Sequence, residues 1–148
     1  MIKRFGRYGL LLLFGCAICG VVSAIGGLKF FSGLLDYGHE VGDSANAFML
    51  ALRENRLNDA YAMLTPDLQE KQSKVNFREA FNGNSIKDWK FSNFSIKNDL
   101  GYVAGTTTDN DGNHFVAFQL VNRQGKWAIT GYNLGTLGWI GTVIDPSD

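Results

Sequence analysis

Residues 86–96 read IKDWKFSNFSI, and across this stretch the spacing of apolar side chains becomes that of a β-strand. Trp89 and Phe91 alternate on one face of the predicted strand, whereas Phe94 and Ile96 follow the opposite phase, which indicates a β-bulge between the two pairs. The residues before this stretch have helical spacing, and the residues after it have strand spacing. Helices followed by strands predict an α+β fold rather than alternating βαβ units.

Three further strands are predicted after this one. Residues 102–108 and 114–122 are joined by the turn DNDGN at 109–113, and a turn at 123–126 leads into a last strand at 127–133. Turns rich in Asn, Asp and Gly join neighbouring antiparallel strands. The expected sheet is therefore antiparallel, bent and four-stranded.

The helical half of the domain precedes the sheet. Asp43 or Ser44 can cap a helix whose six consecutive apolar residues, 47–52, indicate burial on more than one side. Asn58 and Ser73 can cap shorter helices that follow it. We therefore expect helices that pack on the bent sheet.

The N-terminal apolar segment, residues 10–28, contains no charged residue. Its nineteen residues would span about 28 Å as a helix, close to the hydrocarbon thickness of a bilayer. Lys3, Arg4 and Arg7 precede it, so the positive-inside bias predicts a cytoplasmic N-terminus. The expected protein is single-pass in the plasma (inner) membrane, with the lipid bilayer as a partner and the C-terminal domain extracytoplasmic.

Three other interpretations of this segment stay open. Residues 22–24 (VSA) fit a signal-peptidase site, which would release a secreted soluble domain, although apolar residues continue well past it. Residues 13–16 (LFGC) resemble a lipoprotein processing motif, but the apolar stretch before them is short. Cys16 and Cys19 form a CxxC pair without the further ligands of a zinc site. Small residues also recur every four positions from Cys16 to Ala24, a spacing that would allow a homodimer of spans.

Composition and patterning together divide the chain. We expect a basic stub and transmembrane helix at 1–35, a hinge at 36–43, an α+β domain at 44–135 and an apolar tail at 136–148. The tail could cap the domain, add to the sheet or lie at the membrane surface. Ten basic and fourteen acidic residues follow residue 29, a net charge of −4 without a basic stripe, so no nucleic-acid partner is expected.

Two stretches resemble the nuclear-transport-factor-two-like (cystatin-like cone) superfamily, especially its membrane-anchored or secreted bacterial domains of unknown function. ANAFMLALRENRLNDAYAMLTPDLQ at 45–69 resembles the opening helices, and DGNHFVAFQLVNRQGKWAITGY at 111–132 is similar to the closing hairpin. The resemblance covers about residues 44–133, and the tail continues beyond the expected end. It implies a curved sheet wrapped round the long helix, which leaves a cone whose mouth can hold a ligand.

The resemblance also directs attention to acid–base residues, because enzymes of this superfamily use an Asp or His base with Tyr or Asp donors inside the cone. His114 and Asp88 are the candidate catalytic residues, and Tyr61, Tyr102 and Tyr132 are possible donors. Each candidate base has a structural interpretation as well: His114 as a half-exposed residue at a strand end, and Asp88, flanked by two lysines, as a member of a surface ion pair.

The remaining polar motifs point to turns. Asp99, Asp109 and Asp111 fall in predicted turns, where carboxylates usually face solvent. DNDGNH at 109–114 lacks the glycine at position six and the glutamate at position twelve of a calcium-binding loop. No glycine-rich phosphate loop follows a strand, and the folded part contains no cysteine. We therefore expect no metal and no cofactor.

Aromatic residues are the expected core or the expected lining of a binding pocket. The candidates are Tyr61, Trp89, Phe91, Phe118 and Trp127. The sequence predicts a membrane-anchored extracytoplasmic domain that binds an envelope protein or a small ligand without catalysis. An isomerase or dehydratase-like enzyme with a cone pocket is the alternative, and a buried, perturbed acid or base in the pocket would favour it.

Overall fold

The computed structural model describes residues 40–141. The chain divides into two compact units, Met1–Tyr37 and Gly38–Asp148, and the described residues all belong to the second unit. The apolar segment at 10–28 and its two cysteines lie outside the described residues. Within residues 40–141, none of the helices has the length and apolar character needed to cross a membrane.

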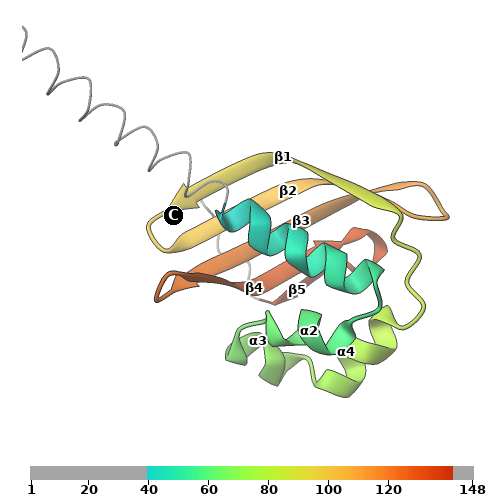
Figure 1. The fold of residues 1–148 in the computed structure, drawn as a ribbon, viewed down its shortest axis with the longest axis horizontal. Helices are drawn as coiled ribbons and strands as arrows, with labels where there is room; N and C mark the ends of the chain where they lie inside the picture. Colours follow the sequence, from blue (N-terminus) through green and yellow to red (C-terminus); the bar gives the residue numbers. More distant parts are fainter. Residues whose placement is uncertain (1–39, 142–148) are drawn as a thin grey trace, which may run out of the picture. The chain divides into compact units, whose positions relative to one another are not determined.

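The first helix covers residues 40–53 (Figure 1). Its buried side chains recur at helical spacing and include Val41, Ala45, Phe48, Met49 and Leu52. We expected a cap at Asp43 or Ser44, and this prediction is wrong because the chain is already helical at residue 40. The helix extends through Val41 since that side chain, only 1% exposed, belongs to the buried stripe.

Three short helices follow the first helix: α2 (Leu57–Ala62), α3 (Pro66–Lys71) and α4 (Lys74–Phe81). Ser73 caps α4 as predicted, because its hydroxyl oxygen accepts a hydrogen bond of 3.3 Å from the Asn76 backbone N–H. The cap predicted at Asn58 is wrong. Helix α2 begins one residue earlier, at Leu57, which places this buried side chain in the first turn.

Five antiparallel strands form one sheet in the order β1-β2-β3-β4-β5: β1 (Asp88–Lys97), β2 (Leu100–Thr108), β3 (Asn113–Arg123), β4 (Lys126–Leu134) and β5 (Trp139–Gly141). The predicted bulge is confirmed, since the register of β1 shifts between Phe91 and Asn93. The expected number of four strands is corrected to five. Gly135 and Gly138 have positive φ angles of 63° and 67°, and the turn that they form brings the tail back beside β4.

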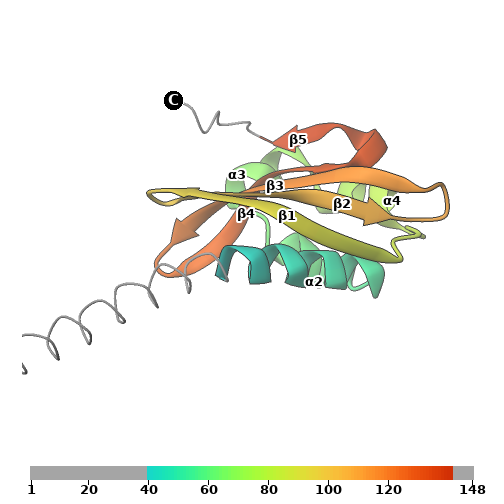
Figure 2. The same ribbon diagram turned by 90° about the horizontal axis from the view of Figure 1, so that it is seen from above.

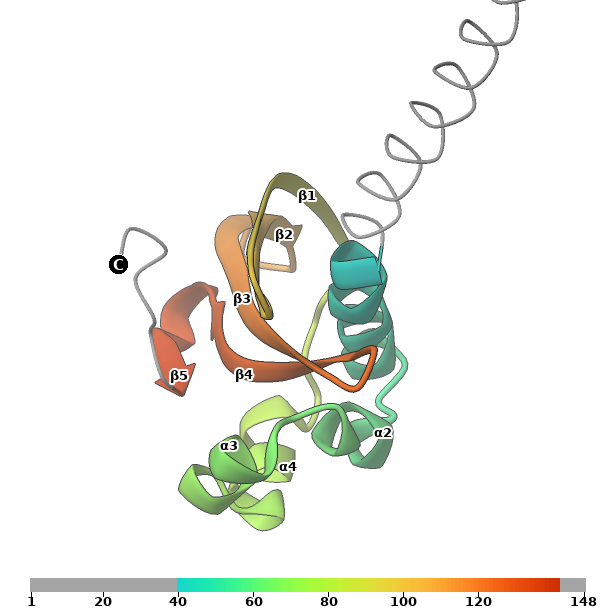
Figure 3. The ribbon, with the colours of Figure 1, turned by 90° about the vertical axis from the view of Figure 1, so that its left-hand side faces the viewer.

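The sheet is strongly bent, and the first helix lies along its open side (Figures 2 and 3). Figure 3 shows the sheet curling from β1 to β4, with the first helix across the open side and α2, α3 and α4 grouped beside β4. Leu64 makes a short parallel bridge to Ile129, which joins the chain after α2 to β4. The predicted α+β class is therefore confirmed.

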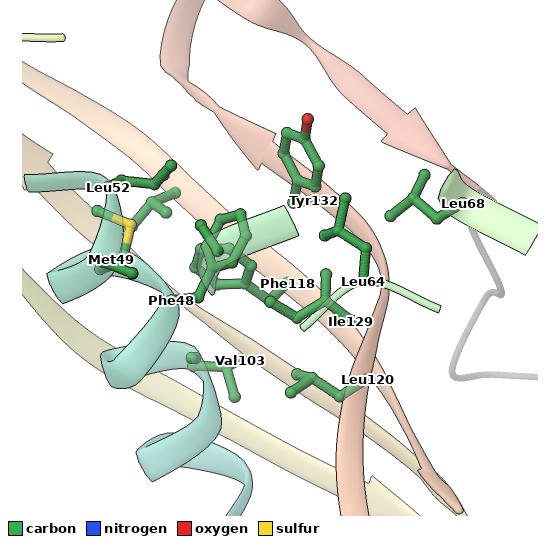
Figure 4. Close-up of a cluster of buried hydrophobic side chains, with 14 of the residues drawn as sticks. Phe48, Met49, Leu52, Leu64, Leu68, Val103, Phe118, Leu120, Ile129 and Tyr132 are labelled. Carbon is green, nitrogen blue, oxygen red and sulfur yellow. The ribbon is translucent and has the colours of Figure 1, made fainter. Parts of the chain in front are cut away.

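The hydrophobic core lies between the first helix and the sheet (Figure 4). Side chains from every layer meet there, including Phe48, Met49, Leu52, Leu64, Leu68, Val103, Phe118, Leu120, Ile129 and Tyr132. Since all of these residues lie within the second compact unit, the described fold has a core of its own.

Candidate functional site

Aromatic side chains fill the interior of the bent sheet. Phe48 of the first helix contacts Phe118 and Tyr132 at ring-centroid distances of 5.6 and 5.8 Å, and it contacts Phe77 of α4 at 6.2 Å. All four side chains are completely buried. A ligand could enter this space only by displacing these rings, so the interior is packed core.

The five aromatic residues expected as core or as pocket lining make contacts between several elements of the fold. Phe118 packs edge-to-face against Phe91, with ring centroids 5.8 Å apart. Trp89 lies beside the first helix, where its Nε1–H donates a 2.8 Å hydrogen bond to the side-chain oxygen of Asn46. The guanidinium of Arg53 lies 4.9 Å from the centroid of the same ring. These contacts attach β1 and β3 to the helix.

Tyr61 and Trp127 also have structural surroundings. The Tyr61 hydroxyl donates a shared hydrogen bond to the backbone carbonyl oxygens of Gln69 and Gln72, each 3.1 Å away. This contact ties α2 to the end of α3. Trp127 is 8% exposed and lies within the hydrophobic core cluster. Four of the five aromatic candidates thus join neighbouring elements of the fold: Tyr61, Trp89, Phe91 and Phe118. The fifth, Trp127, belongs to the core cluster and also lines a small cleft that is described below.

Tyr132 is the tyrosine at the centre of the core. Its hydroxyl donates a 2.5 Å hydrogen bond to the side-chain oxygen of Gln72, which is itself buried. Burial raises the pKa of Tyr132 above its ordinary value, and the hydrogen bond to Gln72 opposes this effect only in part. The hydroxyl therefore stays protonated at neutral pH and serves the packing of the core.

A cleft of about 300 Å³ opens at one end of the sheet, and we name it the rim cleft. Figure 1 shows this end at the right, where the β2–β3 turn and the connection from α4 to β1 come together. Its apolar surface consists of Ala80, Phe81, Ile86, Leu134 and Leu137. Its polar side chains are those of Asn84, Ser85, Thr107, Asp109, Asp111 and His114. The rim cleft thus combines an apolar surface with an acidic one and has no Lys or Arg in its lining.

Asp109 and His114 form a pair in the rim cleft. The Oδ1 atom of Asp109 accepts backbone hydrogen bonds from Asp111 at 2.7 Å and Gly112 at 3.1 Å, and it lies 3.1 Å from Nε2 of His114. The pKa of the Asp109 carboxyl is lowered, chiefly by the backbone hydrogen bond from Asp111 and further by His114. Asp109 therefore forms the predicted turn and, in addition, contacts the imidazole of His114.

The structure does not bring Asp88 and His114 together. Thr107 of β2 pairs with Trp89 on one side and with His114 on the other, so these side chains share one face of the sheet. Asp88 precedes Trp89 and is exposed on the opposite face, because successive residues of a strand point to opposite faces. Asp88 is therefore not part of the rim cleft, whereas His114 lines it.

In the rim cleft, a hydrogen-bonded Asp–His pair lies beside apolar surface. Within residues 40–141, no three His, Cys, Asp or Glu side chains are arranged to hold a metal ion. The chain matches no protein-family model, and it matches none of the curated proteins with which it was compared. Membership of the cone superfamily therefore stays a prediction that depends on the residues at 45–69 and 111–132.

Proposed function

We propose that residues 40–141 form a non-catalytic binding domain whose recognition site is the rim cleft. The apolar segment at 10–28 would hold this domain at the outer face of a bacterial inner membrane. One observation carries the proposal: aromatic rings occupy the interior where a cone enzyme would bind its substrate. We therefore place the ligand at the open rim, where apolar and polar side chains converge.

The lining of the rim cleft indicates the chemistry of its ligand. Its volume is at the lower end of the range for small-molecule sites, so the ligand is small or is one side chain of a protein partner. Phe81, Ile86 and Leu134 favour an apolar body. Asp109 stays ionised at neutral pH and Asp111 lies beside it, which favours a cationic head such as a protonated amine.

The architecture supports the superfamily resemblance behind this proposal. A strongly bent antiparallel sheet has the first helix across its open side, and α2 to α4 are grouped beside β4 (Figure 3). The same resemblance includes membrane-anchored domains of unknown function, which agrees with the charge-free segment at 10–28. Fold likeness alone does not assign an activity, so the ligand chemistry depends on the rim cleft itself.

A pair of matched probes tests the ligand chemistry. The full-length chain in nanodiscs of zwitterionic lipid is titrated with phenethylamine and with phenylpropionate, and binding is followed by saturation-transfer NMR. We expect the amine to bind more tightly than the acid. The double substitution Asp109→Asn with Asp111→Asn should weaken amine binding about threefold to tenfold, the range expected for exposed charge pairs.

The control for this titration is Asp99→Asn. Asp99 is an exposed turn residue outside the rim cleft, so its substitution removes one negative charge and leaves the cleft intact. Equal binding of the amine and the acid, or an equal loss of amine binding in the Asp99→Asn variant, would show that the rim cleft does not recognise cations.

A separate experiment tests the location of the domain. A C-terminally tagged chain is fractionated, its N-terminal residue is determined and protease is added from outside the cell. Integral membrane behaviour, an intact N-terminus and external cleavage are expected. A released chain that begins at Ile25 would contradict anchoring and would indicate a secreted protein.

A cone-pocket enzyme of the isomerase or dehydratase kind is the second candidate, and the Asp109–His114 pair favours it. An imidazole held by a carboxylate in an open cleft could remove a proton next to a carbonyl group. Solvent deuterium exchange into phenylacetone, followed by NMR, tests this function. Exchange that is lost in His114→Gln and kept in Asp88→Asn would support the enzyme, and no exchange above the buffer rate would exclude this reaction.

A further inference from the structure

We propose that a second, independent cleft binds a small neutral molecule through a carbonyl group. This cleft, which we name the Trp127 pocket, has a volume of about 190 Å³. It is lined by Ser44, Ala47, Ala62, Met63, Trp127, Ala128 and Ile129. The pocket shares no lining residue with the rim cleft, so the two sites can be tested separately.

Three elements build the Trp127 pocket. Ser44 and Ala47 belong to the first helix, Ala62 is the last residue of α2, and residues 127–129 lie near the start of β4. The backbone N–H of Ile129 donates a 2.9 Å hydrogen bond to the carbonyl of Met63, which fixes the end of α2 against β4. The walls of the pocket are therefore held by main-chain contacts.

The indole N–H of Trp127 supplies the polar group of this pocket. Its Nε1 atom is buried and has no hydrogen-bond partner among the described residues, although Trp127 is only 8% exposed. A Cβ atom added at Gly101 would lie 3.1 Å from Cζ3 of Trp127, which is on the ring edge opposite Nε1. Since Trp127 lines the pocket, we infer that its Nε1 edge faces the pocket. A buried donor without an acceptor is costly, and a ligand acceptor would remove this cost.

Trp89 provides a contrast within the same domain. Its indole N–H donates to Asn46 at 2.8 Å and is therefore satisfied by the protein itself. Tryptophan side chains that are buried usually find such a partner. The unpaired Nε1 of Trp127 beside an open cleft thus distinguishes this residue and points to an acceptor supplied from outside.

The lining determines the class of ligand. None of the seven lining side chains is ionisable, so the ligand should be neutral. Alanine, methionine and isoleucine side chains favour an apolar body. A cavity of about 150 Å³ is enough for benzene, so this pocket suits a molecule slightly larger than benzene. The indole is a donor only, which calls for an acceptor such as a ketone, ester or amide carbonyl.

Acetophenone and cumene are probes of nearly equal shape, and only acetophenone carries a carbonyl. The full-length chain, labelled with 5-fluorotryptophan and placed in nanodiscs, gives one fluorine signal for each of its three tryptophans. Single Trp→Phe variants assign the signals. We expect acetophenone to move the Trp127 signal. The dissociation constants of both probes, in the native chain and in the variants, are measured by saturation-transfer NMR, which does not need the Trp127 signal.

The hydrogen bond is tested by comparing ratios of dissociation constants. The dissociation constant of cumene divided by that of acetophenone should fall at least about fivefold in Trp127→Phe. The variant lacks the indole N–H, which can donate a hydrogen bond to the carbonyl of acetophenone but not to cumene. An unchanged ratio would overturn the proposal, and so would a Trp127 signal that does not move at saturating acetophenone.

A second variant keeps the test valid if Trp127→Phe does not fold. Ala62 is an exposed residue of the lining, so Ala62→Leu should fill the pocket and abolish binding of both probes without disturbing the core. Val75→Leu is the control, since Val75 is an exposed residue of α4 that lines neither cleft. Undiminished acetophenone binding in Ala62→Leu would also overturn the proposal.

Discussion

Tyr132 carries its hydroxyl group into the centre of the aromatic core. The ring contacts Phe48 and Phe81, and the hydroxyl donates to Gln72 from a completely buried position. Burial disfavours the tyrosinate, so the pKa of Tyr132 is raised in the folded state. A single residue therefore links the packing of the sheet to the response of the domain to alkaline pH.

The stability contribution of Tyr132 should be lost at high pH. It is fully present below the unfolded-state pKa of about 10 and decreases as the pH rises toward the higher folded-state pKa, by up to about 1.4 kcal/mol per pH unit. We expect Tyr132→Phe to lower the free energy of unfolding by about 1 kcal/mol at neutral pH, because Gln72 loses its partner, and by less above pH 10.

Urea unfolding of both chains across neutral and alkaline pH measures this difference. Tyr102→Phe is the control, since Tyr102 is a half-buried strand tyrosine outside the core cluster. A difference between Tyr132→Phe and the native chain that stays constant above pH 10 would contradict the proposed linkage.

At the scale of elements, strand β1 lies very close to β2 beside its bulge. A Cβ atom added at Gly105 would lie 2.0 Å from the carbonyl oxygen of Lys90 and 2.8 Å from the Cα of Phe91. Gly105 pairs directly with Phe91, at the position where the register of β1 begins to shift. The bend of the sheet at this point therefore depends on a residue without a side chain.

Gly105→Ala should force β1 away from β2. We expect the free energy of unfolding to fall by about 1–3 kcal/mol, as for other overpacking substitutions, with faster amide exchange in β1 than in β4. Gly42→Ala is the matched control, because its Cβ would meet only the edge of the half-exposed Phe94 ring, at 3.0 Å, and alanine favours a helix. Equal losses in the two variants would contradict this account.

At the scale of the whole molecule, the second compact unit contains all of the described core. The buried cluster begins at Val41 and ends at Tyr132, and its members come from the first helix, the short helices and the sheet. Because the second unit is compact by itself and its own elements supply this cluster, we expect that folding of the domain does not require the N-terminal segment.

A chain of residues 38–148 should therefore fold on its own. We expect one cooperative thermal transition by circular dichroism, with a midpoint within a few degrees of that of the full-length chain. A broad transition together with binding of a dye for exposed apolar surface would show that the first unit is needed for folding.

Local patterns of the sequence determined much of this protein. The change to period two predicted the strands, the phase reversal predicted the bulge after Phe91, and Ser73 was recognisable as a cap. The sequence also predicted the turn at 123–126. In the structure Gln124 and Gly125 adopt the positive φ angles of a tight hairpin turn. These features depend on residues that are close together in the sequence, so the sequence alone can predict them.

Only the tertiary structure determined which residues come together in the rim cleft and in the Trp127 pocket. The sequence could not show that Asp109 contacts His114 in a cleft with Phe81 or that Asp88 points to the opposite face. It also could not show that Trp127, whose indole N–H is unpaired, lines a cleft together with Ala62. These relations depend on the register of paired strands and on helices far apart in the chain. Strand periodicity specifies which side chains share a face, but long-range packing selects which faces meet and what remains open between them.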